Sequence, residues 1–248
     1  MATDISHQIR RFWDDDAATY DRSPSHHPHQ PEELAAWRAA LRRLLPAPPA
    51  RVLDAGAGTG FLSLLLARQG YQVTAVDLSE RMLAALRSKA GGLGLEVRTV
   101  HADAAQPPAG ENFDAVVERH LLWTLPEPGA ALAAWRAAAP AGRLVLIEGT
   151  WGTASGADAI RARARKLARL IRRPEPDHHD HYPAQVTRAL PYANGLRPAD
   201  AIRLVEDSPW GAARFERLAD VEWATVSGRG MLAGLLGTAP RWAVIAGS

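Results

Sequence analysis

The sequence predicts a doubly wound α/β fold, in which helices cover both faces of a mainly parallel sheet. From Arg51 onward, short apolar runs alternate with helical segments, which is typical of βαβ units. A loop with alternate glycines separates the first apolar run from the first of these helices, and an acidic residue, Asp77, ends the second run. Together these observations favour a cofactor site at the carboxyl ends of the strands.

The segment before this alternation is expected to form a helical cap. Apolar and aromatic side chains recur near helical spacing within residues 4–21 and again within residues 32–45, where Pro46 ends the pattern. Residues 23–31 are rich in histidine and proline and are expected to be a loop. We therefore assign residues 1–45 to the cap.

The core elements follow from the positions of the apolar runs. Strands are expected at 52–54, 72–76, 96–101, 113–118, 143–149, 214–219 and 241–246. Helices are expected at 61–69, 80–89, 129–138 and 198–207.

Residues 151–195 interrupt this rhythm and are interpreted as an inserted lid. They contain a basic helical run at 159–173 and then a loop rich in His, Asp and Pro. The whole chain is expected to be a single domain, in which residues 50–150 bind the cofactor and residues 196–248 complete the sheet.

The overall composition excludes several classes of protein. Hydrophobic residues make up 47% and charged residues 23%, ordinary values for a globular chain, and a net charge of +2 gives no strong field for nucleic acid. No apolar run reaches the roughly 20 residues that a membrane span needs. The absence of cysteine excludes disulfides and thiolate ligands. We expect a cytoplasmic monomer or homodimer with no nucleic-acid partner and no stable membrane association.

The glycine loop carries the functional prediction. Gly56, Gly58 and Gly60 permit a sharp turn and close approach of a ligand, and the helix that follows directs unpaired N–H groups to the same crevice. Asp77 is placed to accept hydrogen bonds from both hydroxyls of a ribose. A nicotinamide fingerprint reads G-x-G-x-x-G, whereas these glycines alternate as G-x-G-x-G after the acidic Asp54.

This segment resembles the class I S-adenosylmethionine-dependent methyltransferases, and among them the ubiquinone/menaquinone-biosynthesis-like small-molecule group. The resemblance covers residues 50–150 well and the flanks loosely. It implies a Rossmann-like, doubly wound sheet of seven strands with an antiparallel last strand, an N-terminal helical cap and an inserted lid. It also implies S-adenosyl-L-methionine as the cofactor and S-adenosyl-L-homocysteine as its product.

The resemblance assigns the cofactor contacts residue by residue. The glycine loop lies against the methionine part, Asp77 holds the ribose, and Asp103 accepts from the exocyclic amine of adenine. Tyr20 of the cap lies at the carboxylate end. The implied cofactor-binding residues are Tyr20, Asp54, Gly56, Gly58, Gly60, Asp77, Leu78, Met82, Asp103, Ala104 and Arg119.

The acceptor side follows from the chemistry of the reaction. Methyl transfer from a sulfonium is an in-line displacement, so positioning in a dry pocket supplies most of the catalysis. A neutral histidine near pH 7 suits the proton of a hydroxyl or an amine acceptor. His120 lies where the family places residues next to the transferred methyl group, so it is the candidate base; the alternative is a role as a wall of the pocket.

The lid contributes further candidates. Residues 177–181 carry adjacent His and Asp side chains, but adjacent spacing argues against one closed metal site, so we expect no metal. A loop that brings His181 and Tyr182 to the acceptor is favoured. The candidate substrate-binding residues are Trp13, Trp123, Trp151, His181 and Tyr182.

The sequence therefore predicts an enzyme that methylates O, N or C of a small-molecule acceptor, in secondary metabolism. A peptide or protein methyltransferase is the alternative within the same class and requires a longer open groove. A nicotinamide-dependent oxidoreductase and a non-catalytic cofactor-binding module are the alternatives from other classes.

Overall fold

The computed structural model describes most of the chain. The described residues are 2–23, 26–28, 30–149, 160, 163–164, 182–227 and 237–247. Of the basic run at 159–173, residues 160, 163 and 164 are described, and they are helical. Trp151 and His181, both predicted to contact the acceptor, lie outside the described residues.

One seven-stranded sheet forms the centre of the protein, with the strand order β3-β2-β1-β4-β5-β7-β6. Its strands are β1 Arg51–Ala55, β2 Gln72–Asp77, β3 Arg98–His101, β4 Ala115–Arg119, β5 Arg143–Gly149, β6 Ala213–Arg217 and β7 Arg241–Gly247. The pairs among β1 to β5 are parallel, whereas β7 pairs antiparallel with both β5 and β6. The predicted sheet and its antiparallel last strand are confirmed.

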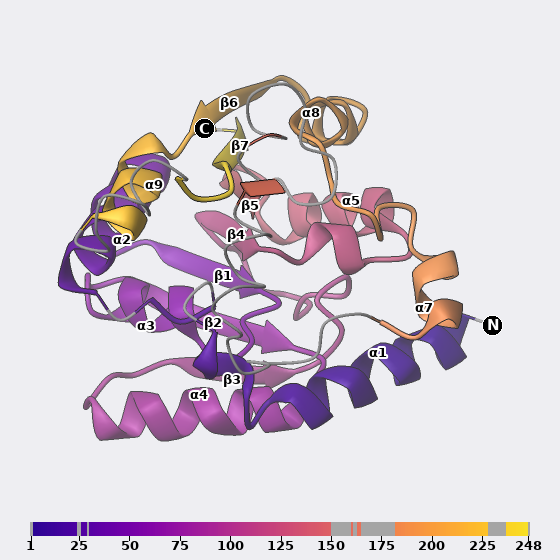
Figure 1. Ribbon diagram of the computed structural model, residues 1–248, viewed down its shortest axis with the longest axis horizontal. Helices are drawn as coiled ribbons and strands as arrows, with labels where there is room; N and C mark the ends of the chain where they lie inside the picture. Colours follow the sequence, from indigo (N-terminus) through magenta and orange to yellow (C-terminus); the bar gives the residue numbers. More distant parts are fainter. Residues whose placement is uncertain are drawn as a thin grey trace.

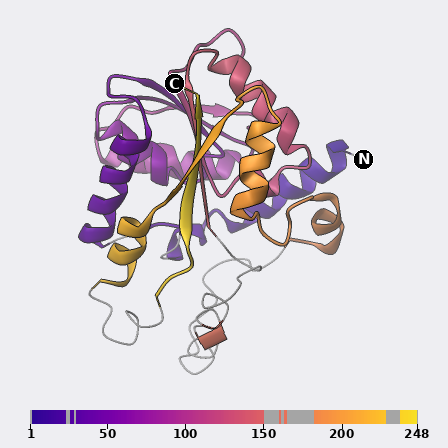
Figure 2. The same cartoon turned by 90° about the horizontal axis from the view of Figure 1, so that it is seen from above.

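Helices cover both faces of this sheet. Their bounds are α1 Ala2–Asp16, η1 Tyr20–Arg22, α2 Pro31–Leu44, α3 Phe61–Ala67, α4 Glu80–Gly92, η2 Leu122–Thr124, α5 Pro128–Ala138, α7 Ala184–Ala189, α8 Pro198–Glu206 and α9 Ala219–Val226. Seen from above, α2 and α9 lie on one side of β7, and α5 and α8 lie on the other (Figure 2).

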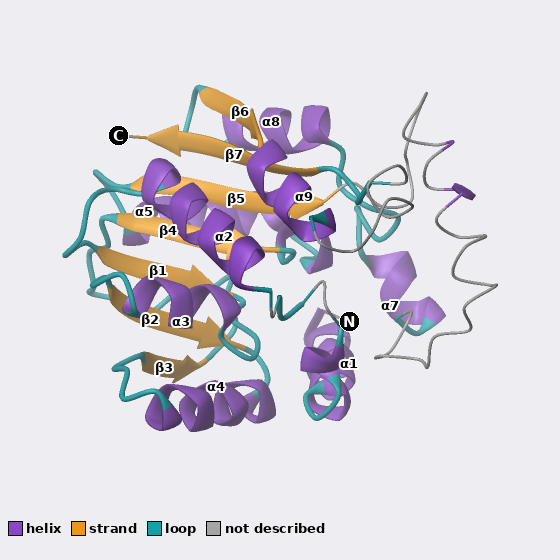
Figure 3. Cartoon of the chain, turned by 60° about the vertical axis from the view of Figure 1, so that its left-hand side comes forward, coloured by secondary structure: helices purple, strands orange, loops and turns teal. Residues whose placement is uncertain are grey.

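Two hydrophobic layers hold the helices on the sheet. Trp37 of α2, Leu65 of α3 and Val221 of α9 are buried against one face. Trp135 of α5 and Val205 of α8 are buried against the opposite face. Figure 3 shows α2, α3 and α9 together in front of the strands. Removal of this apolar surface from water is the main stabilising contribution to the fold.

The first helix extends beyond the sheet and helps to form the cap. Helix α1 contacts α4 at one end and α7 further along (Figure 1). Ile9 of α1 is buried together with Val186 and Leu190, which lie in α7 and directly after it. The residues that precede the core in sequence therefore pack on the C-terminal part of the lid segment 151–195, and both lie beside the carboxyl ends of the strands.

Helix α9 is an element that the sequence pattern did not predict. We expected a strand up to Ala219, but β6 ends at Arg217 and a helix begins at Ala219. Leu218 and Val221 are fully buried in the same layer as α2. Tertiary packing against α2 decides the conformation of this short segment, which has no clear period of its own.

Candidate active site

The glycine loop leaves β1 through a backbone that only glycine adopts readily. Gly56, Gly58 and Gly60 have φ values of 69°, 54° and 91°, all in the left-handed region. The N–H groups of Gly56 and Ala57 donate to the carbonyl oxygen of Val76 at 2.9 and 3.0 Å. These bonds attach the loop to the end of β2, where Asp77 follows.

The surroundings of the three glycines show which of them pack against side chains and which faces a possible ligand. A Cβ on Gly56 would lie 2.8 Å from Cδ1 of Leu121, and a Cβ on Gly60 would collide with Leu86. A Cβ on Gly58 would instead meet Cε1 of Tyr20 at 3.9 Å and nothing nearer. Gly58 therefore faces the open side of the loop, beneath Tyr20, where a ligand can approach the backbone.

Asp77 is held rigidly beside this open side. Its Oδ2 accepts from the N–H of Gly58 at 2.7 Å, and its Oδ1 accepts from the N–H of Ser79 at 2.8 Å. Each carboxylate oxygen has a second lone pair for a further donor, such as a ribose hydroxyl. Burial raises the pKa of Asp77 to about 6, although the two hydrogen bonds tend to lower it. The carboxylate fits the predicted ribose contact.

Asp54 lies in β1, directly before the glycine loop, and is buried. Only 2% of its surface is exposed, and its Oδ2 accepts from Oγ of Ser63 in α3 at 2.6 Å. Burial raises the pKa of Asp54 to about 7, and the hydrogen bond from Ser63 opposes this rise. The structure places Asp54 where it joins β1 to the helix that follows the loop.

The residues predicted to surround adenine follow the ends of β2 and β3. Met82 is 2% exposed in α4, and Leu78 packs beside the cluster that contains Tyr182. Asp103 is half-buried, and its Oδ1 accepts from the N–H of Ala105 at 2.9 Å. The carbonyl oxygen of Ala104 accepts from Nε1 of Trp135 at 2.7 Å.

The N-terminal cap is attached directly to the cofactor loop. Asp21 accepts from Oγ1 of Thr59 at 2.5 Å and from Nζ of Lys89 at 2.8 Å. Asp14 accepts from Oγ of Ser79 at 2.6 Å. Desolvation tends to raise the pKa of Asp21, but Lys89 and Thr59 hold it below its usual value. Tyr20 is positioned over Gly58 by these contacts on either side of it.

Aromatic side chains from three parts of the chain meet under the cap. The ring centre of Tyr182 lies 4.6 Å from the ring centre of Phe12, 5.8 Å from that of Trp13 and 5.7 Å from that of Trp123. Trp13 also contacts Tyr20 edge to face at 5.8 Å. The structure therefore brings three predicted acceptor residues, Trp13, Trp123 and Tyr182, into one cluster beside the predicted cofactor residue Tyr20.

Arg119 ends β4 and connects the site to the layer of α2 and α3. Its guanidinium lies 4.5 Å from the ring centre of Phe61, and its Nη2 donates to the carbonyl oxygen of His26 at 3.3 Å. His26 stacks on Tyr20 at 4.1 Å. Burial lowers the pKa of Arg119 to about 10, so the side chain remains a cation at neutral pH.

His120 follows Arg119 in a strained conformation. Its φ of 62° is the one positive value at a non-glycine residue among the described part of the chain, and such strain is common at functional sites. Its Nδ1 lies 3.2 Å from Oε2 of Glu148, with the His120 side chain 25% exposed and that of Glu148 completely buried. Burial, Arg119, Arg241 and His26 hold the pKa of His120 well below its usual value. The imidazole is therefore neutral at pH 7.

Glu148 is a site residue that the sequence analysis missed. It stands on β5 and contacts the predicted base from the side away from solvent. Charged residues are almost never fully buried unless they have a partner. A glutamate at the end of the otherwise apolar run Leu144–Ile147 was the available signal, because the carboxyl ends of parallel strands meet at the site.

No group of three or more His, Cys, Asp or Glu side chains that could hold a metal ion occurs in the described residues. Within those residues, no helix is long and apolar enough to cross a membrane. The His-rich loop 177–181 lies outside them.

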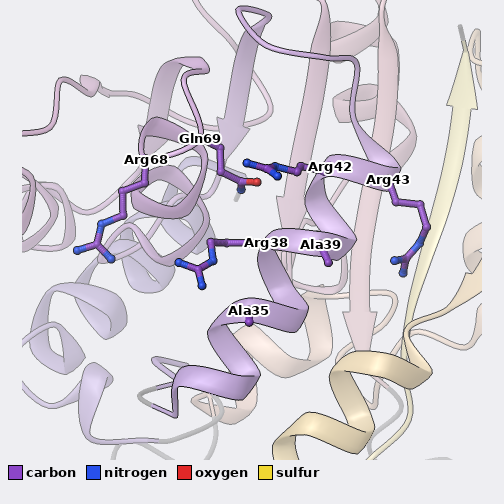
Figure 4. A pocket seen from close by; sticks show the side chains of 7 residues that line it. All are labelled: Ala35, Arg38, Ala39, Arg42, Arg43, Arg68 and Gln69. Atoms are coloured by element: carbon purple, nitrogen blue, oxygen red, sulfur yellow. The ribbon is translucent and has the colours of Figure 1, made fainter.

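A separate basic groove lies between α2 and the end of α3 (Figure 4), with a volume of about 760 Å³. Arg38 and Arg42 of α2 and Arg68 beyond α3 reach toward it, whereas Arg43 turns to Glu216 of β6 at 2.6 Å. The glycine loop stands at the other end of α3, so this groove is not the cofactor site.

The strand order, the loop of alternate glycines and the acid at the end of β2 define the class I S-adenosylmethionine-dependent methyltransferase architecture. Residues 53–146 match the family model of a methyltransferase domain.

Sequence relatives place the chain more narrowly. It is 36% identical over 154 residues to a demethylmenaquinone methyltransferase of Clavibacter sepedonicus, a match that spans 60% of this chain and 62% of that protein. It is 32% identical over 222 residues to a ubiquinone biosynthesis O-methyltransferase of Xanthomonas axonopodis pv. citri, spanning 86% of this chain and 87% of that protein. The chain belongs to the S-adenosylmethionine-dependent methyltransferase family, in the ubiquinone/menaquinone-biosynthesis-like group.

A solved structure agrees with this assignment at the level of the fold. Magnesium protoporphyrin IX methyltransferase from Synechocystis PCC 6803, crystallised with S-adenosylhomocysteine, superimposes with a TM-score of 0.59 at 18% identity, covering 98% of this chain and 100% of that chain. The predicted family and fold class are confirmed.

Proposed function

We propose that this chain transfers the methyl group of S-adenosylmethionine to an oxygen, nitrogen or carbon atom of a small ring-containing acceptor. The observation that carries the proposal is the open side of Gly58, bordered by Tyr20 and by the carboxylate of Asp77. A glycine backbone, a phenol and a fixed carboxylate match the amino acid and ribose parts of the cofactor. The bound cofactor supplies a methyl group on a sulfonium.

The acceptor is proposed to lie against the aromatic cluster of Trp13, Trp123 and Tyr182. Aromatic faces favour flat, apolar molecules, and the polar edges of Trp and Tyr orient them. The sequence relatives support this proposal, because their names refer to demethylmenaquinone and to ubiquinone biosynthesis. Residues 1–45 and the lid at 151–195 are proposed to enclose the acceptor within a single domain.

His120 is proposed to take the proton of the acceptor. Its quarter-exposed ring stands before the buried Glu148, so Nδ1 is held and Nε2 is the atom that receives the proton. When bound, the cofactor would supply its methyl group to the acceptor atom and would leave as S-adenosyl-L-homocysteine. The acceptor proton moves to Nε2, and the resulting imidazolium lies beside the Glu148 carboxyl.

Cofactor binding tests the class of enzyme. We expect S-adenosylmethionine to bind in calorimetry, NADH not to bind, and Asp77→Ala to weaken cofactor binding at least about tenfold, because one charged hydrogen-bond acceptor is worth roughly 1.5–3 kcal/mol. Asp114→Ala, at the opposite end of the sheet, is the control, since its carboxylate accepts from the N–H of Arg51 and lies away from the glycine loop. Binding of NADH, or affinity unaffected by Asp77→Ala, would contradict the assignment.

The turnover of a His120 variant tests whether this histidine acts as the base. With an acceptor found by screening a panel of quinol, phenol and heterocyclic metabolites, His120→Ala is expected to lower kcat by about 10²–10⁴-fold and to leave cofactor affinity unchanged. His101→Ala is the control, because His101 ends β3 and contacts the carbonyl oxygen of Leu78 instead of Glu148. Unchanged turnover in His120→Ala would remove the histidine from the chemistry, and the absence of any methylated acceptor would favour a non-catalytic module.

A further inference from the structure

Two glutamates are buried side by side at the carboxyl ends of β4 and β5. Glu118 and Glu148 are both 0% exposed. Glu118 pairs with Leu146 in the parallel register, so Glu148 is the next residue along β5 that points to the same face. An unpaired buried oxygen is costly, yet Oε1 of each glutamate is buried and has no hydrogen-bond partner among the residues that the structure describes. The proposed chemistry of His120 does not explain both carboxyl groups.

The partners of the two carboxyl groups are unequal. Oε2 of Glu118 accepts from the N–H groups of Leu121 and Leu122 at 2.7 and 3.3 Å, and these donors favour a carboxylate. Backbone N–H groups of Gly149 and Leu122 also lower the pKa of Glu148, but Glu148 additionally contacts the imidazole nitrogen of His120, which can accept a hydrogen bond as well as donate one. A shared proton is therefore better placed on Glu148, as an O–H that donates to Nδ1.

Burial favours retention of this proton in the absence of a cofactor, and the surrounding charges act in both directions. Asp54 of β1 adds negative charge near Glu118, whereas Arg119 of β4 supplies positive charge near Glu148. Arg241 of β7 and His26 act on His120. Desolvation dominates, raising the pKa of Glu118 to about 8 and that of Glu148 well above its ordinary value. Two neighbouring carboxyl groups in a dry site do not both ionise.

The pair also adjoins the cofactor loop. Glu118 is the register partner of Ala55, and Gly56 is the next residue. The side chain of Leu121, whose N–H binds Glu118, packs against Gly56. A cation held over this loop therefore approaches the carboxyl pair through a protein interior of low dielectric constant, where it favours ionisation.

We propose that Glu118 and Glu148 retain a proton in the free protein and release it when the cationic cofactor binds, which leaves Glu148 as the carboxylate that positions His120. The proposal rests on the proposed function. In the release, the O–H bond of Glu148 breaks and an N–H bond forms at Nδ1, while Nε2 loses its proton to solvent. His120 stays neutral, and its Nε2 is now able to accept the proton of the acceptor.

The test compares two ligands that differ by one charge. S-adenosylmethionine carries a sulfonium, and S-adenosylhomocysteine has an uncharged sulfur. Calorimetry in buffers of different ionisation enthalpy counts the protons released by each. We expect up to about one more proton for S-adenosylmethionine near pH 7, and its affinity should rise by up to about tenfold per pH unit more steeply than that of S-adenosylhomocysteine. Titration of Asp77 affects both ligands and cancels in the difference.

Two variants test whether the extra proton release comes from the pair of Glu118 and Glu148. Glu148→Gln is expected to abolish the extra proton release, to remove the steeper rise of S-adenosylmethionine affinity with pH and to lower kcat, with the cofactor still bound. Glu206→Gln, exposed on α8, is the control and should behave as the unaltered protein. A purely structural Glu148 would not change the proton count.

Three results would overturn the proposal. The first is equal proton release by the two ligands in the unaltered protein, which needs no variant. The second is an extra release that persists in folded Glu148→Gln. In both cases the cofactor still binds, so the proposed function survives; absence of S-adenosylmethionine binding, the third result, would end both.

Discussion

Replacement of Gly60 by alanine is expected to lower the free energy of unfolding by about 2–5 kcal/mol. Two costs add at this position. Gly60 has a φ of 91°, which L residues rarely adopt. An added Cβ would collide with Cγ of the fully buried Leu86 and lie 2.9 Å from its Cδ1. Since Gly60 ends the cofactor loop and begins α3, binding of S-adenosylmethionine should weaken as well.

Alanine substitutions at two other glycines distinguish the cost of backbone strain from the cost of the clash with Leu86. Gly94 has a φ of 62° with open space around an added Cβ, so Gly94→Ala is expected to cost only the backbone strain of about 1–2 kcal/mol. Gly91 lies within α4 with open space and without a positive φ, so Gly91→Ala should be neutral or stabilising by up to about 1 kcal/mol. Urea unfolding curves measure all three variants. Equal losses for Gly60→Ala and Gly94→Ala would show that contact with Leu86 costs nothing.

The second large effect is expected where a buried ion pair joins α2 to the antiparallel strand. Oε1 of Glu33 accepts from Nη1 of Arg241 at 3.0 Å and from Oγ1 of Thr225 in α9 at 2.7 Å. Glu33 is 0% and Arg241 is 8% exposed. Glu33→Leu or Arg241→Met alone is expected to destabilise the protein by about 3–5 kcal/mol, because each leaves an uncompensated buried charge.

The double variant is expected to be less destabilised than either single variant. Removing both charges together leaves no unpaired buried charge. In a double-mutant cycle measured by chemical denaturation, the double variant should therefore lose much less stability than the sum of the two single losses. Arg43 of α2 and Asp220 of α9 provide an exposed control pair, since they lie 3.1 Å apart but are 42% and 41% exposed. Disruption of that pair should cost about 0–1 kcal/mol. Additive losses for Glu33 and Arg241 would contradict the role of buried charge.

The carboxyl pair gives the active site a feature that neither glutamate predicts alone. In the sequence, Glu118 is simply the acid before Arg119, and Glu148 is a charge at the end of an apolar run. Their proximity depends on the parallel register of β4 and β5, in which Glu118 is opposite Leu146. A proton shared between them is therefore a property of strand pairing.

The contacts among the predicted acceptor residues also depend on how distant segments pack. Trp13 and Tyr182 are separated by most of the chain, yet their rings lie 5.8 Å apart. The family resemblance suggested both residues, but their contact follows from the packing of α1 on α7. Helix α9 was missed for the corresponding reason, because its conformation depends on burial against α2 and not on its own pattern.

The sequence by itself determined the order of the strands and of most of the helices, the glycine loop and Asp77, and with them the family. These features are local, because strand periodicity, glycine spacing and an acid at a strand end are all encoded within a few neighbouring residues. Only the tertiary structure decided that Tyr20 covers Gly58, that Glu148 contacts His120 and that Glu118 shares its face of the sheet. Those relationships join distant segments, and strand register and helix packing bring them together.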